Sequence, residues 1–175
     1  MAVTFQDIGT INFEVYESGT NRLLGMANVE LPTIEYETVD TKGNGLGGTR
    51  AFPIRGNTGS MELKLVWRQV NTDYAPLFRH ESINLSLYGA TSGYEGGSGE
   101  IKVIQHRIET RVTPKSDALG KFEPSATMDN EITFEALVFY YYINGVEQLG
   151  IDWANMIHRV NGEDYSAPTR QALGL

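Results

Sequence analysis

Three glycines, Gly43, Gly45 and Gly48, come closer to a ligand-binding motif than any other residues of this chain. Their spacing matches G-x-G-x-x-G, which binds the pyrophosphate of a dinucleotide when a helix follows the loop directly. The residues that follow are Thr-Arg-Ala-Phe-Pro, a run that cannot start a long helix. We therefore expect no dinucleotide site here, and we interpret the segment as a protruding loop with Leu46 and Phe52 as its main apolar side chains.

The other residues with catalytic potential lack a catalytic arrangement. His80, His106 and His158 are far apart, without the H-x-x-H spacing that places two metal ligands on one helix face. No serine lies in a G-x-S-x-G elbow, and the absence of cysteine excludes disulfides, thiolate metal sites and cysteine nucleophiles. We expect no enzymatic activity, no cofactor and no bound metal.

The charge of the chain limits its partners. A net charge of −8 argues against a protein that grips nucleic acid, since phosphate binding needs clustered Lys and Arg. Composition alone favours solubility as the reason for this charge; a more specific reading is an acidic surface that lets DNA slide past. No signal peptide is evident, and no apolar run approaches the ~20 residues that span a bilayer.

The elements that carry these residues are predicted to be strands. Many glycines and tyrosines and frequent two-residue alternation favour a mainly β protein. Strands are predicted over residues 10–17, 61–68, 83–88, 100–112 and 131–143, and a first hairpin should turn at residues 18–21.

The segments between these strands are predicted to be loops and short helices. Residues 40–60 should form a long loop and residues 93–99 a flexible connection. Near Gln105 the apolar residues change from one face of the strand to the other, which suggests a bulge or a strand between two covered surfaces. Short helices are expected over 74–80 and, with Ser166 as N-cap, over 167–173.

The Asn144-Gly145 pair predicts a two-residue hairpin turn, because such turns need positive φ at both positions. Counting outward from the turn pairs Tyr140 with Leu149 and Phe139 with Gly150. Gly150 should then leave room for the Phe139 ring.

Several C-terminal motifs also occur in a characteristic order. The aromatic strand 139–142 is followed by Asn144-Gly145, Ile151-Asp152, Asn161-Gly162 and a closing Leu173-Gly174-Leu175. In this order they resemble the C-terminus of the major tail tube protein family of contractile-tailed phages. Residues 31–37, the glycine-rich loop and residues 61–67 are similar to the N-terminal half of that family, whereas residues 82–130 match it least.

The resemblance implies a structural role and a fold. It implies one domain over residues 1–175, an antiparallel β-barrel or sandwich with a short mid-chain helix, a short C-terminal helix and a protruding loop at about 40–60. Members form hexameric rings that stack into the inner tube of a contractile tail in the virion, assembled in the host cytoplasm. The implied partners are further copies of the chain, the sheath, baseplate and tape-measure proteins, and DNA passing through the lumen without specific binding.

The resemblance also suggests two sets of residues. Candidates for the contacts between subunits or rings are Gly45, Leu46, Gly47, Phe52, Tyr165, Leu173 and Leu175. Candidates for acidic positions in the lumen are Glu30, Glu35 and Glu37. Two alternatives stay open: a tube subunit of a contractile bacteriocin or secretion system that carries no genome, and a monomeric β-barrel that binds a small ligand.

Overall fold

The computed structural model describes residues 5–19, 22–24, 28–43, 47–69, 72, 75–95 and 99–175. Its elements in chain order are β1 (Phe5–Glu17), β2 (Arg22–Leu23), β3 (Asn28–Glu30), β4 (Tyr36–Thr41), β5 (Arg50–Thr58), β6 (Glu62–Trp67), the 3-10 turn η1 (Ala75–Phe78), β7 (Ile83–Glu95), β8 (Ile101–Ala118), β9 (Asn130–Ile143), β10 (Val146–Asp152), β11 (Ile157–Val160), β12 (Glu163–Asp164) and α1 (Ala167–Ala172). No helix among these residues is long and apolar enough to cross a membrane.

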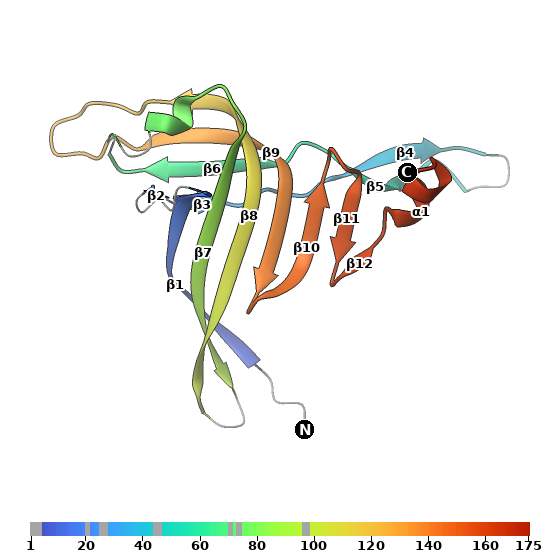
Figure 1. Ribbon diagram of the computed structural model, residues 1–175, viewed down its shortest axis with the longest axis horizontal. Helices are drawn as coiled ribbons and strands as arrows, with labels where there is room; N and C mark the ends of the chain where they lie inside the picture. Colours follow the sequence, from blue (N-terminus) through green and yellow to red (C-terminus); the bar gives the residue numbers. More distant parts are fainter. Residues whose placement is uncertain are drawn as a thin grey trace.

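An antiparallel sheet, with ten strands among the described residues, makes up most of the fold (Figure 1). Its main path runs β12-β11-β10-β9-β8-β7-β1-β2, while β4 and β5 form a separate two-stranded sheet. β9 is the branch point, because its first half pairs with β6 and its second half with β10, and β8 follows it along the other edge. The prediction of a mainly β, antiparallel fold with little helix is confirmed.

The core lies where β6 crosses the long strands β7 and β8 (Figure 1). Met61, Leu63, Leu65 and Trp67 all point into it, as the alternation of residues 61–68 predicts. The other side chains of this core are buried too: Val15, Ile83, Leu85, Leu87, Ile108, Val112, Ile132 and Phe134. The indole Nε1 of Trp67 donates a hydrogen bond of 3.0 Å to the Leu24 carbonyl, so its polar atom is satisfied inside the core.

The terminal hairpin turns at Asn144 and Gly145 as predicted, but its register is shifted by one residue farther from the turn. A bulge after Glu147 pairs Leu149 with Tyr141 and Gly150 with Tyr140. The predicted pairing of Gly150 with Phe139 is therefore wrong. The bulge has a physical reason: it places Leu149 on the core side of the sheet, and a regular register would have turned that side chain outward.

Residues 40–60 form most of a β-hairpin and not the expected long loop. β4 and β5 pair from Thr38 with Pro53 to Thr41 with Arg50, so the connection between them is confined to residues 42–49. The glycines near this turn favoured a loop in the sequence analysis, although the residues that follow them form β5. Gly45 and Leu46, two of the candidates for contacts between subunits, lie outside the described residues.

The first hairpin is shorter than the sequence suggests. β2 pairs with β1 at two positions, Tyr16 with Leu23 and Glu17 with Arg22. β3 instead pairs with β6, from Asn28 opposite Val66 to Glu30 opposite Lys64. Residues 28–30 therefore belong to the branch of the sheet that covers the core and not to the first hairpin.

Two further expectations need correction in the long β7–β8 ribbon. Residues 93–95, expected to be flexible, continue β7, and β8 pairs with β7 through Gln105 without a shift. The phase slip near Gln105 is therefore no bulge in this pairing, and Ile101 and Val103 are exposed. Sequence alternation placed these two residues on a covered face because it shows which side chains share a face but not whether anything covers that face.

The two helical segments lie near their predicted places. η1 is one 3-10 turn, and its Leu77 is buried while Phe78 packs against the core, as expected; the predicted start at residue 74 lies outside the described residues. Ser166 is the N-cap residue of α1, as predicted, but its side chain makes no capping hydrogen bond. Its hydroxyl is instead buried beside the β4–β5 hairpin, next to Gly56.

Candidate assembly surface

The β4–β5 hairpin carries an exposed apolar surface away from the main sheet. Val39 and Phe52 are directly paired across it, and their side chains are 53% and 57% exposed. Every residue of β4 is exposed, so the described part of the chain buries no side chain of this strand. A two-stranded hairpin is marginally stable alone, and this one therefore depends on the contacts at its base and on a partner that covers Val39 and Phe52.

The base of the hairpin is attached to the C-terminal segment by ring contacts. The Tyr36 ring lies 5.7 Å from the His158 ring, and the Arg55 guanidinium lies 5.5 Å from the centre of the Tyr165 ring. Gly56 has φ of +80°, and a Cβ at this position would overlap the Ser166 hydroxyl. Glycine is thus required here both for backbone conformation and for close approach.

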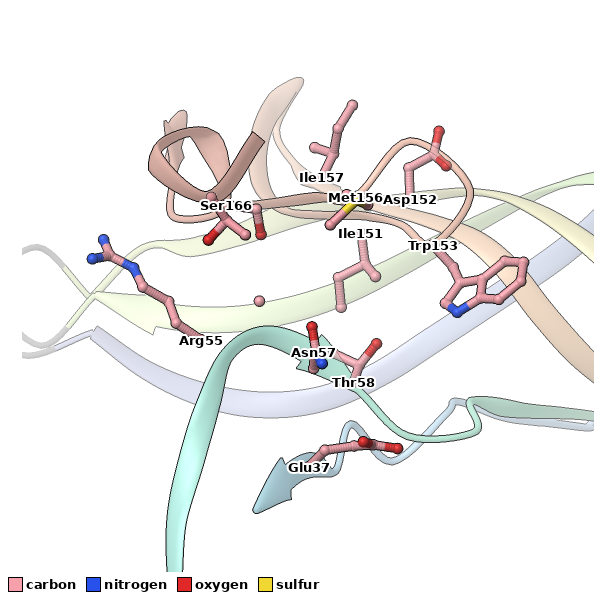
Figure 2. A pocket seen from close by; sticks show the side chains of 12 residues that line it. Glu37, Arg55, Asn57, Thr58, Ile151, Asp152, Trp153, Met156, Ile157 and Ser166 are labelled. Atoms are coloured by element: carbon pink, nitrogen blue, oxygen red, sulfur yellow. The ribbon is translucent and has the colours of Figure 1, made fainter. Parts of the chain in front are cut away.

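A cleft of about 380 Å³ separates the hairpin from the end of the main sheet. Figure 2 shows Glu37 and Thr58 on the hairpin side and Met156 and Ser166 opposite them. The Ser166 Oγ is buried and has no hydrogen-bond partner among the described residues. At the rim, the Trp153 side chain is 68% exposed, which is unusual for so large an apolar group.

The C-terminal segment is held by a compact polar network. Arg170 donates hydrogen bonds of 2.6 Å to the Asp164 carboxylate and 2.7 Å to the Met156 carbonyl. The Ser166 backbone N–H donates to the other Asp164 oxygen at 2.9 Å. The bond from Arg170 is the main reason that the pKa of Asp164 lies below its ordinary value. This network fixes α1 beside the hairpin base.

The histidines that the structure describes in detail are held by packing and hydrogen bonds and do not gather in one place. His106 is hydrogen-bonded at both ring nitrogens, to the hydroxyls of Thr91 at 2.8 Å and Tyr141 at 2.6 Å. His158 is buried at the far end of the sheet, and burial lowers its pKa. Within the described ranges, no three His, Cys, Asp or Glu side chains gather as metal ligands.

Over most of β1, one edge of the main sheet has no pairing strand in the part of the chain that the structure describes. Among the described residues, β2 pairs with β1 at Tyr16 and Glu17, and Leu24 donates a backbone hydrogen bond to the Val15 carbonyl. Residues 5–14 of β1 pair with β7 on their other side, from Phe5 opposite Glu95 onward. The free edge of this stretch presents backbone groups to which another strand could add.

Comparison with known proteins assigns this chain to a family. The family model of phage tail tube protein FII matches residues 10–174. The chain belongs to this family. Phage tail tube proteins are structural, and the chain is accordingly a non-enzymatic structural subunit.

Two solved structures are similar to this chain. One, the sheath/tube terminator of an extracellular contractile injection system called PVC in its extended state, is 16% identical with a TM-score of 0.50; the alignment covers 75% of this chain and 94% of that chain. The other, from the PVC sheath-tube complex, is 17% identical with a TM-score of 0.49 and covers 75% of this chain and 88% of that one. No match was found among curated proteins.

The interface residues suggested for a tail tube subunit fall into two groups. Gly47 and Phe52 belong to the hairpin, and Tyr165 is brought to the same region because Arg55 lies over its ring. Leu173 and Leu175 are 61% and 78% exposed beyond α1. The structure therefore brings the hairpin and the C-terminal segment together, although they are far apart in sequence.

The three glutamates suggested for the lumen of a tail tube do not form one patch. Glu30 and Glu35 line the same shallow groove, where Glu30 lies 3.7 Å from the Lys64 ammonium. Glu37 lies on the hairpin and faces the clefts beside Trp153. All three are exposed.

The sheet face opposite the core carries aromatic and charged groups that the sequence analysis did not single out. The Arg107 guanidinium lies 4.3 Å from the centre of the Tyr142 ring, and Arg159 lies 5.5 Å from that of Tyr140. Arg159 also makes hydrogen bonds of 2.9 and 3.1 Å to the two oxygens of Glu147. Alternation along 138–142 could have indicated this face, but the arginines come from other strands.

Proposed function

We propose that the chain is the subunit of the inner tube of a contractile phage tail, in which hexameric rings stack into a hollow tube. The observation that carries this proposal is the family match over residues 10–174. A sheath would drive the tube through the target envelope, and the chain itself would need no catalytic group. The remaining partners in this proposal are the baseplate and the tape-measure protein, with assembly in the host cytoplasm.

Two features of the monomer support assembly into a tube. The free edge of β1 over residues 5–14 can be covered by a strand of a neighbouring copy, which would continue the sheet around a ring. The exposed pair Val39 and Phe52 offers apolar surface that a neighbour can bury. In a monomer both features leave apolar side chains or backbone groups exposed to water, and in an assembly a neighbour would bury or pair them.

We propose further that Glu30, Glu35 and Glu37 face the lumen and that DNA passes there without binding. Their carboxylates would repel the phosphates of the genome. A chain of net charge −8 suits this role, because few basic groups are available to hold nucleic acid.

A related candidate function is a tube that carries no genome, as in a contractile bacteriocin or injection system. A similar fold occurs in the PVC sheath/tube terminator of an extracellular contractile injection system. Particles assembled with the cognate sheath would distinguish the two: DNA-filled heads attached to the tails indicate a phage, and tails without heads or packaged DNA indicate the genome-free system.

Electron microscopy of the purified chain with baseplate and sheath proteins tests the main proposal. We expect a hollow tube of constant diameter to extend from the baseplate and to carry the sheath outside it. A chain that stays monomeric in the presence of a functional baseplate would contradict the proposal.

A further inference from the structure

An apolar groove lies on the core side of the main sheet, beyond the end of β3. Its volume is about 460 Å³, and its walls include Phe13 of β1, Leu31, Leu87 of β7 and Tyr141 of β9. No Asp, Glu, Lys or Arg occurs among the described residues that line it. Leu31 at its rim is 52% exposed. The groove therefore offers uncharged apolar surface to a partner.

The floor of the groove is recessed, because Gly89 in the middle of β7 contributes no side chain to it. Beside Gly89, His106 makes hydrogen bonds at both ring nitrogens, to Thr91 and to Tyr141. An occupant at the floor would thus need to supply apolar surface and no new hydrogen bond to these three side chains.

The Val39–Phe52 pair has the matching chemistry. Both side chains are uncharged and more than half exposed, and they project from a narrow hairpin. Two copies of a chain with net charge −8 repel each other at a distance, so a contact between copies is favoured where uncharged surfaces meet. Burial of such side chains against an apolar surface stabilises a contact.

The hairpin lies too far from the groove of its own chain to fill it. In Figure 1 the β4–β5 hairpin is at one end of the long axis, while β1 and β3, which form the groove walls, are toward the other. An occupant from β4–β5 must therefore come from a second copy.

We propose that Phe52, with Val39 beside it, enters the apolar groove between Phe13, Leu31 and Tyr141 of a neighbouring copy. This inference rests on the proposed tube function and names the surface that receives the hairpin. The contact joins two different surfaces, so each copy can give one hairpin and receive another. Such a head-to-tail contact can propagate through a ring or from one ring to the next.

Filling the groove should block assembly without unfolding the chain. A Cβ at Gly89 would lie 3.7 Å from the His106 Cβ and 4.0 Å from the Phe13 Cβ, which are ordinary contact distances. We expect Gly89→Val to keep the wild-type urea midpoint or raise it, since valine favours strands, and to lose tube extension on the baseplate. Ala90→Val, which adds a similar volume to the next residue of the same strand, is the matched control. A folded Gly89→Val chain that still extends normal tubes would overturn the proposed contact.

Site-specific crosslinking tests the contact directly, because the chain has no cysteine. The double variant Leu31→Cys/Phe52→Cys should give covalent dimers and longer ladders with a short bismaleimide after tube assembly. Leu31→Cys/Ile101→Cys is the control, because the Ile101 side chain is 66% exposed but lies on the β7–β8 ribbon.

The outcomes separate this contact from the proposed function. The contact is supported if both double variants form tubes of normal shape and only Leu31→Cys/Phe52→Cys gives crosslinked ladders. If Leu31→Cys/Phe52→Cys reacts no better than Leu31→Cys/Ile101→Cys in such tubes, the contact is overturned and the tube function stays intact. If the wild-type chain forms no tube on a functional baseplate, both the function and the contact fail.

Discussion

The Tyr140-Tyr141-Tyr142 run shows how position along a strand decides what a side chain does. Tyr141 faces the core side, where its ring stacks on His106 with centres 5.9 Å apart and its hydroxyl hydrogen-bonds to the imidazole. Tyr140 and Tyr142 face the other side, against Arg159 and Arg107. Burial raises the pKa of all three phenols, so they are neutral at physiological pH. They pack within the sheet and do not form one aromatic platform.

Gly150 should tolerate no side chain, because it lies against one of these tyrosines. A Cβ there would lie 2.9 Å from Cδ1 of Tyr140 and 3.0 Å from the Glu147 carboxylate. We expect Gly150→Ala to lower the free energy of unfolding by roughly 1–3 kcal/mol, measured by urea denaturation. Gly47→Ala, where a Cβ would meet nothing within 4 Å, is the control. Equal midpoints for the two variants would show that Tyr140 moves aside freely.

His158 should make stability depend on pH near neutrality. Burial lowers its pKa in the folded state, whereas in the unfolded chain it titrates near ~6.5. Below about pH 6.5 the unfolded state therefore binds more protons, and the free energy of unfolding should fall until the pH reaches the folded-state pKa. The pKa of neighbouring Asp164 lies below its ordinary value, so its own loss of stability occurs at more acidic pH.

The measurement is urea unfolding of the wild type and of His158→Phe between pH 7.5 and 5. The phenylalanine keeps a ring against Tyr36 and removes the titrating group. We expect the wild type to lose more stability than the variant over this range. Parallel curves for the two chains would exclude His158 as the cause.

At the scale of elements, the bulge between β9 and β10 is the feature that keeps the terminal hairpin in phase with the core. It leaves the turn at Asn144-Gly145 unchanged and moves every later pair by one position. Ile151 is consequently buried, with 2% of its surface exposed, opposite Phe139. A bulge of this kind is selected by which side chains must face inward and not by the turn.

Deleting Gly150 should keep this bulge but turn Ile151 to the outer face, because Ile151 would then pair with Tyr140 and not with Phe139. The loss of one buried aliphatic side chain costs roughly 1.5–3 kcal/mol, a substantial part of the ~5–15 kcal/mol that stabilises a typical domain. We expect this variant to unfold at lower urea, followed by circular dichroism. Deleting Gln148 is the matched control, because Leu149 would then follow Glu147 directly, pair with Tyr141 in a regular ladder and still face the core. Equal midpoints for the two deletion variants would contradict the requirement that Ile151 face inward.

At the scale of the whole molecule, the apolar side chains in the centre are buried, whereas apolar side chains and one strand edge at the margins are exposed. The crossing of β6 over β7 and β8 encloses a continuous apolar core. Val39 and Phe52 of the hairpin and the C-terminal leucines are exposed, and β1 has a free edge among the described residues. This distribution suits a subunit whose remaining surface is buried by neighbours, because exposed apolar surface and open edges are costly in a monomer.

Neutralising the proposed lumen charges should affect passage of DNA and not assembly. Replacing Glu30, Glu35 and Glu37 by glutamine changes the net charge from −8 to −5. The ion pair of Glu30 with Lys64 is exposed and contributes little to stability. We expect normal tubes and slower genome ejection, measured with a DNA-binding dye after receptor triggering.

The control for this prediction replaces the exposed Glu81, Glu100 and Glu123 by glutamine, which gives the same net charge. Ejection at the wild-type rate from tubes that carry the first triple variant would contradict the lumen role. Equal slowing by both triple variants would point to total charge instead of position.

The sequence by itself determined the local structure of this protein wherever one pattern governs. Alternation identified the buried face of residues 61–68, and Asn144-Gly145 located the terminal turn, because side-chain period and backbone φ are properties of short segments. Motif order also suggested the tail tube family, which the match over residues 10–174 confirms.

Tertiary structure alone decided register, coverage and proximity. The bulge after Glu147 arises because distant strands demand a particular inward face, and neighbours along the chain do not encode that demand. Ile101 and Val103 have the pattern of covered residues but lie exposed, since coverage depends on which other strand reaches them. The meeting of the hairpin with Tyr165 and Ser166 is of the same kind, because contacts between segments about a hundred residues apart follow from sheet topology and not from local sequence.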